Sequence, residues 1–376
     1  MAPTFYDVTR NLDPVSITQL ANTRPATTDY LLTSVLPPIL RPTFDARTGT
    51  MRVVSTMAGM VGMDSPYPEG SFIEASDFHE GTLKIAQALT MPEAKTREIQ
   101  AFIQSVGLGT VPADPQAIMT NAILNLYEKG ILQALDDTEE WMRAQALTTG
   151  KIEWTFAGKK VSVDYGLPAK NVQATRTGLA GYGGSESTFW ADLRAARKAL
   201  RSVRAFITSG DTLDMILDND ANKAIVTNDV TTGNIRRVTL RRGVYNESGD
   251  AIALDRDARS TVTLIGYSRV GTVLAPIPGN PRNTVQVQFI PDGTIVAVGD
   301  NQIDNILSVD GTPTQQNALG YTHIGPTVEG AGAVGRWGRI YTPQERPWSA
   351  RVEGVANVLP VIENVSKLYL LRTEVA

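Results

Sequence analysis

The strongest local signal is DPQAIMTNAILNLYEKGILQALDDTEEWMRAQALTTG, residues 114–150. Asp114 is a favourable N-cap, Pro115 a favourable first helical residue and Gly150 a favourable terminator. Between these ends, apolar residues recur at helical spacing, namely Ile123, Leu126, Tyr127, Ile131, Ala134, Leu135, Trp141, Met142 and Ala146. About 35 residues at about 1.5 Å each give a helix of about 50 Å. The pattern therefore predicts one unusually long helix, with Gly130 as the place for a kink.

A helix of this length needs a sheet beside it, because packing of its apolar face supplies most of its stability. The segment RPWSARVEGVANVLPVIENVSKLYLLRTEVA, residues 346–376, predicts two strands. Apolar and polar residues alternate over 352–358, and a continuous apolar run follows at 368–371. We expect both strands in the sheet beside the helix, with Trp141 and Met142 close to them.

The segments around the long helix read as extended structure and small helices. Residues 1–43 are rich in Pro and Thr and predict an extended arm, and residues 51–93 predict a long two-stranded excursion with a Pro- and Gly-rich tip. Residues 151–165 predict a hairpin that turns at Ala157-Gly158. A second helical pattern begins at Trp190, and Asp211 is the predicted cap of a third, short helix. Short strands dominate from about 223 to 340.

Composition excludes several classes of function. The 376 residues include no cysteine, so disulfides, thiolate catalysis and Cys-ligated metals are excluded. The two histidines, His79 and His323, lie far apart and are a poor start for acid–base catalysis. The net charge of −4 gives no global basic excess for holding nucleic acid. No window reaches the ~18 apolar residues of a membrane span, and the N-terminus has no signal-peptide pattern.

Two motifs invite a catalytic interpretation that their context does not support. GAGAVG, residues 330–335, has the glycine spacing of a dinucleotide site, but the sequence after it predicts no helix. DDTEE, residues 136–140, has no histidine beside it, so we expect a solvated or partner-facing acidic patch.

Three further stretches are open to more than one interpretation. RRVTLRRG, residues 236–243, carries four arginines, which favours salt bridges between protein surfaces over nucleic-acid contact, because no aromatic stacking platform accompanies them. DRDARS, residues 255–260, lacks the remaining ligands of a calcium loop. Residues 181–190 read as a flexible joint, with an active-site loop as the alternative.

The order of these elements resembles that of the major capsid proteins of tailed bacteriophages, which have the Hong Kong 97 fold, and in particular the lambda-type capsid family. The most similar local text is FIPDGTIVAVGD, Phe289 to Asp300, and ARVEGVANVLPVIENVSKLYLL, residues 350–371. The resemblance implies an α+β fold whose parts are an N-terminal arm at 1–43, an extended loop at 44–92, a peripheral domain at 93–167 with a spine helix at 114–149 and a hairpin at 151–165, an axial domain at 168–340, and a return to the peripheral sheet at 341–376.

The resemblance also implies a function. It predicts a major capsid protein, not an enzyme and without cofactors, whose copies form pentamers and hexamers of an icosahedral shell around packaged double-stranded DNA. Assembly would take place in the bacterial cytoplasm, with no membrane, and the product would be the virion. A portal and a decoration protein are expected partners. Because the arm begins almost at Met1, where some relatives carry a scaffolding segment, a separate scaffolding protein is expected too.

Candidate contacts between subunits follow from the same resemblance. They are Tyr67, Phe72 and Phe78 around the tip of the excursion, and Arg236, Arg237, Arg241 and Arg242. The nearest alternative is an encapsulin-type nanocompartment shell, which shares the fold. The alternative from another class is a nucleotide-dependent enzyme built on GAGAVG.

Overall fold

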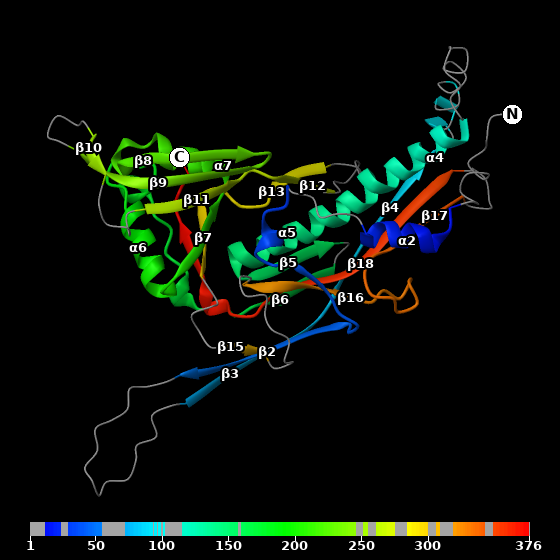
Figure 1. Cartoon of the computed structure of the whole chain (residues 1–376), viewed down its shortest axis with the longest axis horizontal. Coiled ribbons are helices and arrows are strands. Elements are labelled where there is room, and N and C mark those ends of the chain that lie inside the picture. Colours follow the sequence, from blue (N-terminus) through cyan, green and yellow to red (C-terminus); the bar gives the residue numbers. More distant parts are fainter. Residues whose placement is uncertain are drawn as a thin grey trace, which may run out of the picture.

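The computed structural model has a five-stranded sheet beside one long helix and a seven-stranded sheet in the other half of the molecule, near the C-terminal end of that helix (Figure 1). It describes residues 12–23, 29–54, 72–92, 115–156, 159–245, 251–254, 261–274, 284–299, 306–308, 319–342 and 349–375, and a few positions between 94 and 101. Asp114, the turn at Ala157-Gly158 and the stretch 255–260 lie outside the described residues.

The long helix is present and runs without a break. It consists of α4 (Pro115–Leu126), a π-helical segment (Tyr127–Leu132) and α5 (Gln133–Thr149). Gly150 ends it with φ +70°, the left-handed conformation that glycine adopts at little cost. The π segment contains Gly130, where a side chain would collide with Leu89 of the adjacent strand. This glycine therefore permits close packing of the helix on the sheet.

A five-stranded sheet lies beside this helix, and β18 (Ala350–Ile362) is its central strand. β18 pairs with β16 (Gly320–Gly325), β17 (Trp337–Tyr341) and β4 (Leu83–Met91), while β1 (Pro38–Leu40) extends the sheet beyond β16. Ile131 and Leu135 of the helix pack with Val352 in one buried cluster. The predicted packing of the helix on the first C-terminal strand is confirmed.

The second sheet forms the other half of the molecule. Its strand order is β10 (Ala251–Leu254), β9 (Ile235–Tyr245), β11 (Thr261–Tyr267), β7 (Val203–Thr208), β14 (Thr294–Gly299) and β19 (Leu368–Arg372), and β8 (Ala224–Thr232) is paired with β9. Helices α6 (Phe189–Leu200) and α7 (Gly210–Asp218) cover one face through Leu193 and Leu213. Ser209 caps α7 by accepting from the Thr212 amide, so the predicted cap Asp211 lies instead in the first turn.

The last apolar run was assigned to the wrong sheet. β19 pairs with β14 in the seven-stranded sheet, not with the strands beside the long helix. Leu368 and Leu370 face the cluster that contains Met142, whereas Tyr369 and Leu371 face α6 and α7. A run that is buried on both faces has no amphipathic pattern to identify its neighbours. Trp141 is only half-buried, and it contacts Trp154 edge to face with ring centroids 4.8 Å apart.

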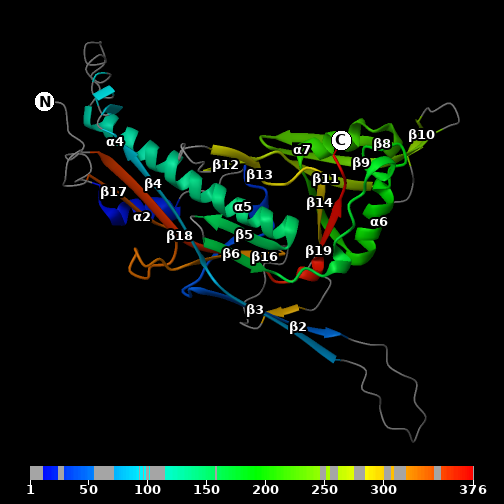
Figure 2. The same ribbon diagram turned by 180° about the vertical axis from the view of Figure 1, so that it is seen from behind.

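The predicted segment bounds also need correction. β16 and β17 lie in the five-stranded sheet, so the chain returns to it by residue 320 and not at 341. The excursion ends at Gly81, because β4 belongs to that sheet as well. Its described strands are β2 (Asp45–Val54) and β3 (Phe72–Gly81), with β15 (Ile306–Ser308) paired to β2. Figures 1 and 2 show β2 and β3 extending away from the body.

The described part of the arm is packed on its own chain. Helix α2 (Pro14–Thr23) buries Ile17 and Ala21 beside the long helix and β17. The short helix η1 (Leu32–Ser34) buries Leu32 in the central core. These apolar positions were too sparse in sequence to suggest a core contact.

The remaining elements are two hairpins and short 3-10 turns. β5 (Lys151–Phe156) and β6 (Lys159–Asp164) form the hairpin that the sequence predicts after the long helix. β12 (Val270–Leu274) and β13 (Thr284–Gln288) form a second one. The turns are η3 (Ala169–Asn171), η4 (Gly178–Ala180), η5 (Asp220–Asn222) and η8 (Val365–Lys367).

Candidate functional site

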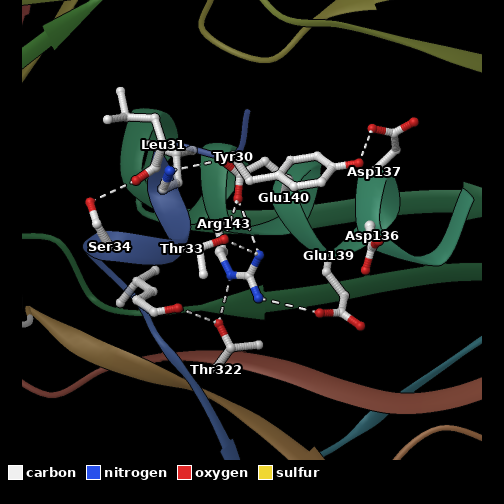
Figure 3. A network of polar contacts seen from close by, with 12 residues as sticks. Tyr30, Leu31, Thr33, Ser34, Asp136, Asp137, Glu139, Glu140, Arg143 and Thr322 are labelled. Atoms are coloured by element: carbon white, nitrogen blue, oxygen red, sulfur yellow. Dashed lines mark hydrogen bonds and ion pairs between the residues drawn. The ribbon is translucent and has the colours of Figure 1, made fainter. Parts of the chain in front are cut away.

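The acidic run of the long helix is buried, and the prediction of a solvated or partner-facing patch was wrong. Glu139 and Glu140 are 2 % and 0 % exposed. Arg143, one turn further along the helix, reaches both, with Nη2 3.3 Å from a Glu139 oxygen and Nη1 3.1 Å from a Glu140 oxygen. Figure 3 shows these side chains lying between the helix and Thr322 of β16, whose hydroxyl accepts from Arg143 Nε at 2.8 Å.

Two more arginines come from distant parts of the chain. Arg336, just before β17, lies 2.6 Å from Asp136 and 2.7 Å from Glu139. Arg269, between β11 and β12, lies 2.7 Å from Asp137. We call these four carboxylates and three arginines the charge hub. All four acids have a cationic partner within the subunit.

The charge hub joins three parts of the fold at Glu140. Its carboxylate accepts from the Leu32 amide of the arm at 2.8 Å and from the Tyr267 hydroxyl of the seven-stranded sheet at 3.0 Å (Figure 3 shows the arm side). Burial raises the pKa of Glu140, against the effect of Arg143 and the two donors. Burial also raises the pKa of Tyr267, and the neighbouring Glu140 charge adds to the rise. The hub therefore stabilises the arrangement of arm, helix and sheet.

Among the residues that the structure describes, no three His, Asp or Glu side chains gather in a way that could hold a metal ion. His323 is buried, with Nε2 2.8 Å from the Thr43 carbonyl oxygen, and burial lowers its pKa. His79 lies on β3, 3.5 Å from Asp45. In the described part of the chain, no helix is long and apolar enough to cross a membrane.

The GAGAVG stretch forms the loop between β16 and β17. A strand and not a helix begins after it, at Trp337. The loop packs on α2, where the Arg336 amide donates to the Asn22 side chain at 2.9 Å. Asn22 also occupies the space beside Gly335. This geometry differs from the strand–loop–helix unit on which dinucleotide binding depends.

The candidate arginines of β9 are divided between the two faces of the sheet, because side chains alternate along a strand. Arg236 is held by Asp214 at 2.6 Å and Asp229 at 2.7 Å within the same subunit. Arg237 and Arg242 are exposed, and Arg241 is half-buried. Of the aromatic candidates, Tyr67 lies outside the described residues, and Phe72 and Phe78 lie on β3. The contacts of these candidates with other subunits stay predictions.

The sequence model of the family described as Phage major capsid protein E matches residues 13–314. Comparison with curated proteins by sequence gave no match. Among solved structures, a protein assigned to the capsid of a prophage of E. coli CFT073 is similar with a TM-score of 0.59 at 12% identity, over 96% of this chain and 99% of that one. A structure from Mycobacterium phage Patience has a TM-score of 0.41 at 11% identity, over 96% of this chain and 86% of that one. The SrpI encapsulin of Synechococcus elongatus PCC 7942 has a TM-score of 0.42 at 11% identity, over 96% and 95%.

The similarity to the prophage capsid protein shows the class of fold to which this chain belongs. Its architecture is the Hong Kong 97 fold. The chain belongs to the phage major capsid protein E family, and it is a capsid protein of a phage virion. This confirms the resemblance in fold, family and function.

Proposed function

We propose that copies of this chain close into pentamers and hexamers of an icosahedral shell around packaged double-stranded DNA, without catalysing a reaction. The observation that carries this proposal is the β2–β3 hairpin. Within the described residues it pairs along its length only with β15, and it extends away from both sheets. A two-stranded ribbon is marginal in isolation, so support from a neighbouring subunit is expected.

Several finer features belong to the same proposal. The excursion that contains the β2–β3 hairpin lies over a neighbouring subunit, and Tyr67, Phe72 and Phe78 make apolar contacts with that subunit. The net charge of −4 suits a wall that contains DNA without binding it tightly, because phosphate contacts dominate affinity for DNA. Assembly takes place in the host cytoplasm with a separate scaffolding protein, a portal and a decoration protein. The parts of the subunit correspond to an arm, an extended loop, a peripheral domain and an axial domain.

The first test is assembly of the purified chain. Light scattering at micromolar concentration should detect rings or shells, and electron microscopy of particles from infected cells should show a portal vertex and DNA. A monomer under all conditions would contradict the proposal, and small shells filled with an enzyme would support the encapsulin alternative.

The second test removes the hairpin. Replacing residues 47–79 by a short Gly-Ser turn should leave the melting temperature of the subunit nearly unchanged and abolish stable shells. The matched control is a deletion that continues through Met91 and removes β4. Because β4 pairs with β18 over nine residue pairs, this longer deletion should destabilise the subunit itself. A subunit that unfolds after the shorter deletion would contradict the assignment.

A further inference from the structure

The outer face of α6 carries positive charges that no acidic side chain among the described residues balances. Arg194, Lys198 and Arg201 are all exposed. Arg194 and Lys198 are four residues apart and lie on one side of the helix, and Arg201 is the residue directly after its last turn. No ion pair or hydrogen bond between described residues involves any of the three. We call this set the α6 cationic face. Arg242 of β9 lies next to it, because Arg194 and Arg242 line the same surface depression of about 300 Å³.

The outer face of α7 carries charges of the opposite sign. Asp211, Asp214 and Asp218 are exposed at a spacing of three and four residues, which again places them on one side of the helix. Within the described part of the chain, only Asp214 has a cationic partner, Arg236. We call this set the α7 acidic face.

Both helices hold these faces in fixed orientations. The opposite side of α6 buries Phe189 and Leu193, and that of α7 buries Leu213 and Ile216, in one core against the seven-stranded sheet. Figures 1 and 2 place α6 at the end of the molecule farthest from α4, and α7 between α6 and the β12–β13 hairpin. One domain thus presents two rigid charged patches of opposite sign at different places on its surface.

Two different and complementary patches on one molecule are what a head-to-tail contact between identical subunits requires. Such a heterologous contact generates a closed ring when its rotation returns to the first subunit. We propose that the α6 cationic face of one subunit binds the α7 acidic face of the next subunit in the ring. This inference rests on the proposed assembly into rings and identifies the surfaces that select the neighbour.

A second copy explains the pair of patches better than DNA does. DNA would engage the α6 cationic face but would be repelled by the α7 acidic face on the same domain. Exposed ion pairs contribute little affinity each, but arrays of them fix register and reject wrong partners. The contact therefore decides which surfaces meet, while apolar contacts elsewhere supply the remaining affinity.

The experiment uses three full-length variants. The first, Arg194→Glu with Lys198→Glu, makes both faces acidic, and the second, Asp211→Lys with Asp218→Lys, makes both basic. The third combines the four substitutions and exchanges the charges. The first and second should each raise the protein concentration for half-maximal assembly by about tenfold or more, because attraction becomes repulsion. The third should return close to the parent value. Far-ultraviolet circular dichroism and melting temperature check that each variant is folded.

Mixing the first and second variants gives the sharper result. Each repels its own copies, but an acidic α6 face meets a basic α7 face whenever the two variants alternate. Strict alternation closes only rings with an even number of subunits. Equimolar mixtures should therefore recover six-membered rings and not five-membered ones, as counted by native mass spectrometry.

Three outcomes would overturn the inference while leaving the capsid function intact. They are normal assembly of both reversed variants, failure of the charge-exchanged variant to recover although it is folded, and recovery of five-membered rings in the mixture. Normal rings with a loss of DNA retention only in the first variant would assign the α6 cationic face to DNA instead. Failure of the parent to assemble would instead contradict the proposed function itself.

Discussion

The charge hub on α5 and the charged faces of α6 and α7 both consist of acidic and basic side chains. Those of the hub are paired within the subunit, whereas most of those on α6 and α7 are exposed and unpaired among the described residues. In the hub, Arg143, Arg269 and Arg336 meet four acids, and the central pairs are almost fully buried. On α6 and α7, five of the six charges meet nothing in the described part of the subunit. The hub therefore acts on the fold of one subunit, and the two faces are available to act between subunits. Burial of a charge, more than its presence in the sequence, separates the two roles.

The largest expected effect comes from Arg143→Ala. Removing one member of a buried ion pair leaves an uncompensated charge, and this typically costs about 3–5 kcal/mol of the free energy of unfolding. Arg143 is 3 % exposed and contacts two carboxylates, so it belongs to that class. Urea unfolding measures the loss. The matched control Arg194→Ala, on the α6 cationic face, should leave the midpoint nearly unchanged. Equal losses of unfolding free energy in the two variants would contradict the view that the hub, and not the α6 cationic face, stabilises the subunit.

Tyr267→Phe should have the next largest effect. The substitution keeps the ring and removes the hydroxyl that donates to Glu140 at 3.0 Å. A hydrogen bond to a charged group contributes about 1.5–3 kcal/mol. Tyr30→Phe is the control, since Asp137 keeps Arg269 as a partner after the change. Tyr30→Phe should therefore lower the free energy of unfolding by less than Tyr267→Phe does. The reverse order would show that Asp137, and not Glu140, is the acid that contributes more to stability.

The dependence of stability on pH should differ in sign between two buried acids. Burial raises the pKa of Glu140, so its contribution to stability is present at low pH and is lost as pH rises through the folded pKa. Burial also acts to raise the pKa of Asp192, but hydrogen bonds from Arg176 and Thr188 outweigh it and lower the pKa. Its contribution is present above the unfolded pKa and is lost as pH falls.

Two variants separate these signs. As pH falls from about 8 to about 4, the parent should gain unfolding free energy relative to Glu140→Gln and lose it relative to Asp192→Asn. Differences that move in the same direction would show that the two sites do not titrate as their surroundings imply.

The smallest effect is expected for Arg236→Ala. Arg236 forms its ion pairs with Asp214 and Asp229 at the surface, where solvent screens them. The melting temperature should fall by no more than about 2 °C, measured by differential scanning calorimetry at low and high salt. Arg237→Ala is the matched control on the other face of β9. A large loss would mean that surface charges also hold the fold together.

Local sequence pattern was sufficient to predict individual helices and strands, but not which other elements they pack against or pair with. The long helix, the hairpin after it and the strand at 352–358 were predictable because their apolar spacing is regular over many residues. The acidic run was misinterpreted because two of its arginines lie about 130 and 200 residues away. The remaining signal was local: Arg143 follows Glu139 by four residues and Glu140 by three, which is the spacing of helical ion pairs.

The pairing of strands that are far apart in sequence could not be predicted either. Nothing in the run 368–371 distinguishes the sheet of β14 from the sheet of β18, because both faces of the run are apolar. The candidate residues of the excursion and of β9 stay predictions, since a single subunit does not show which of them contact a neighbouring copy. Sequence can identify such residues as exposed or apolar, but the neighbour that they contact is not encoded in local periodicity.

The central position of β18 sets the time at which a newly made subunit can finish folding. β4 is synthesised about 260 residues before the strand with which it pairs, and at about 5–20 residues per second this is a wait of roughly 13–50 seconds. Until residue 362 has left the ribosome, β4, β16 and β17 have no common partner, and the long helix has no finished surface on which to lie. A nascent chain therefore has no completed body to offer another subunit before β18 has emerged, and translation itself delays the first encounter between subunits.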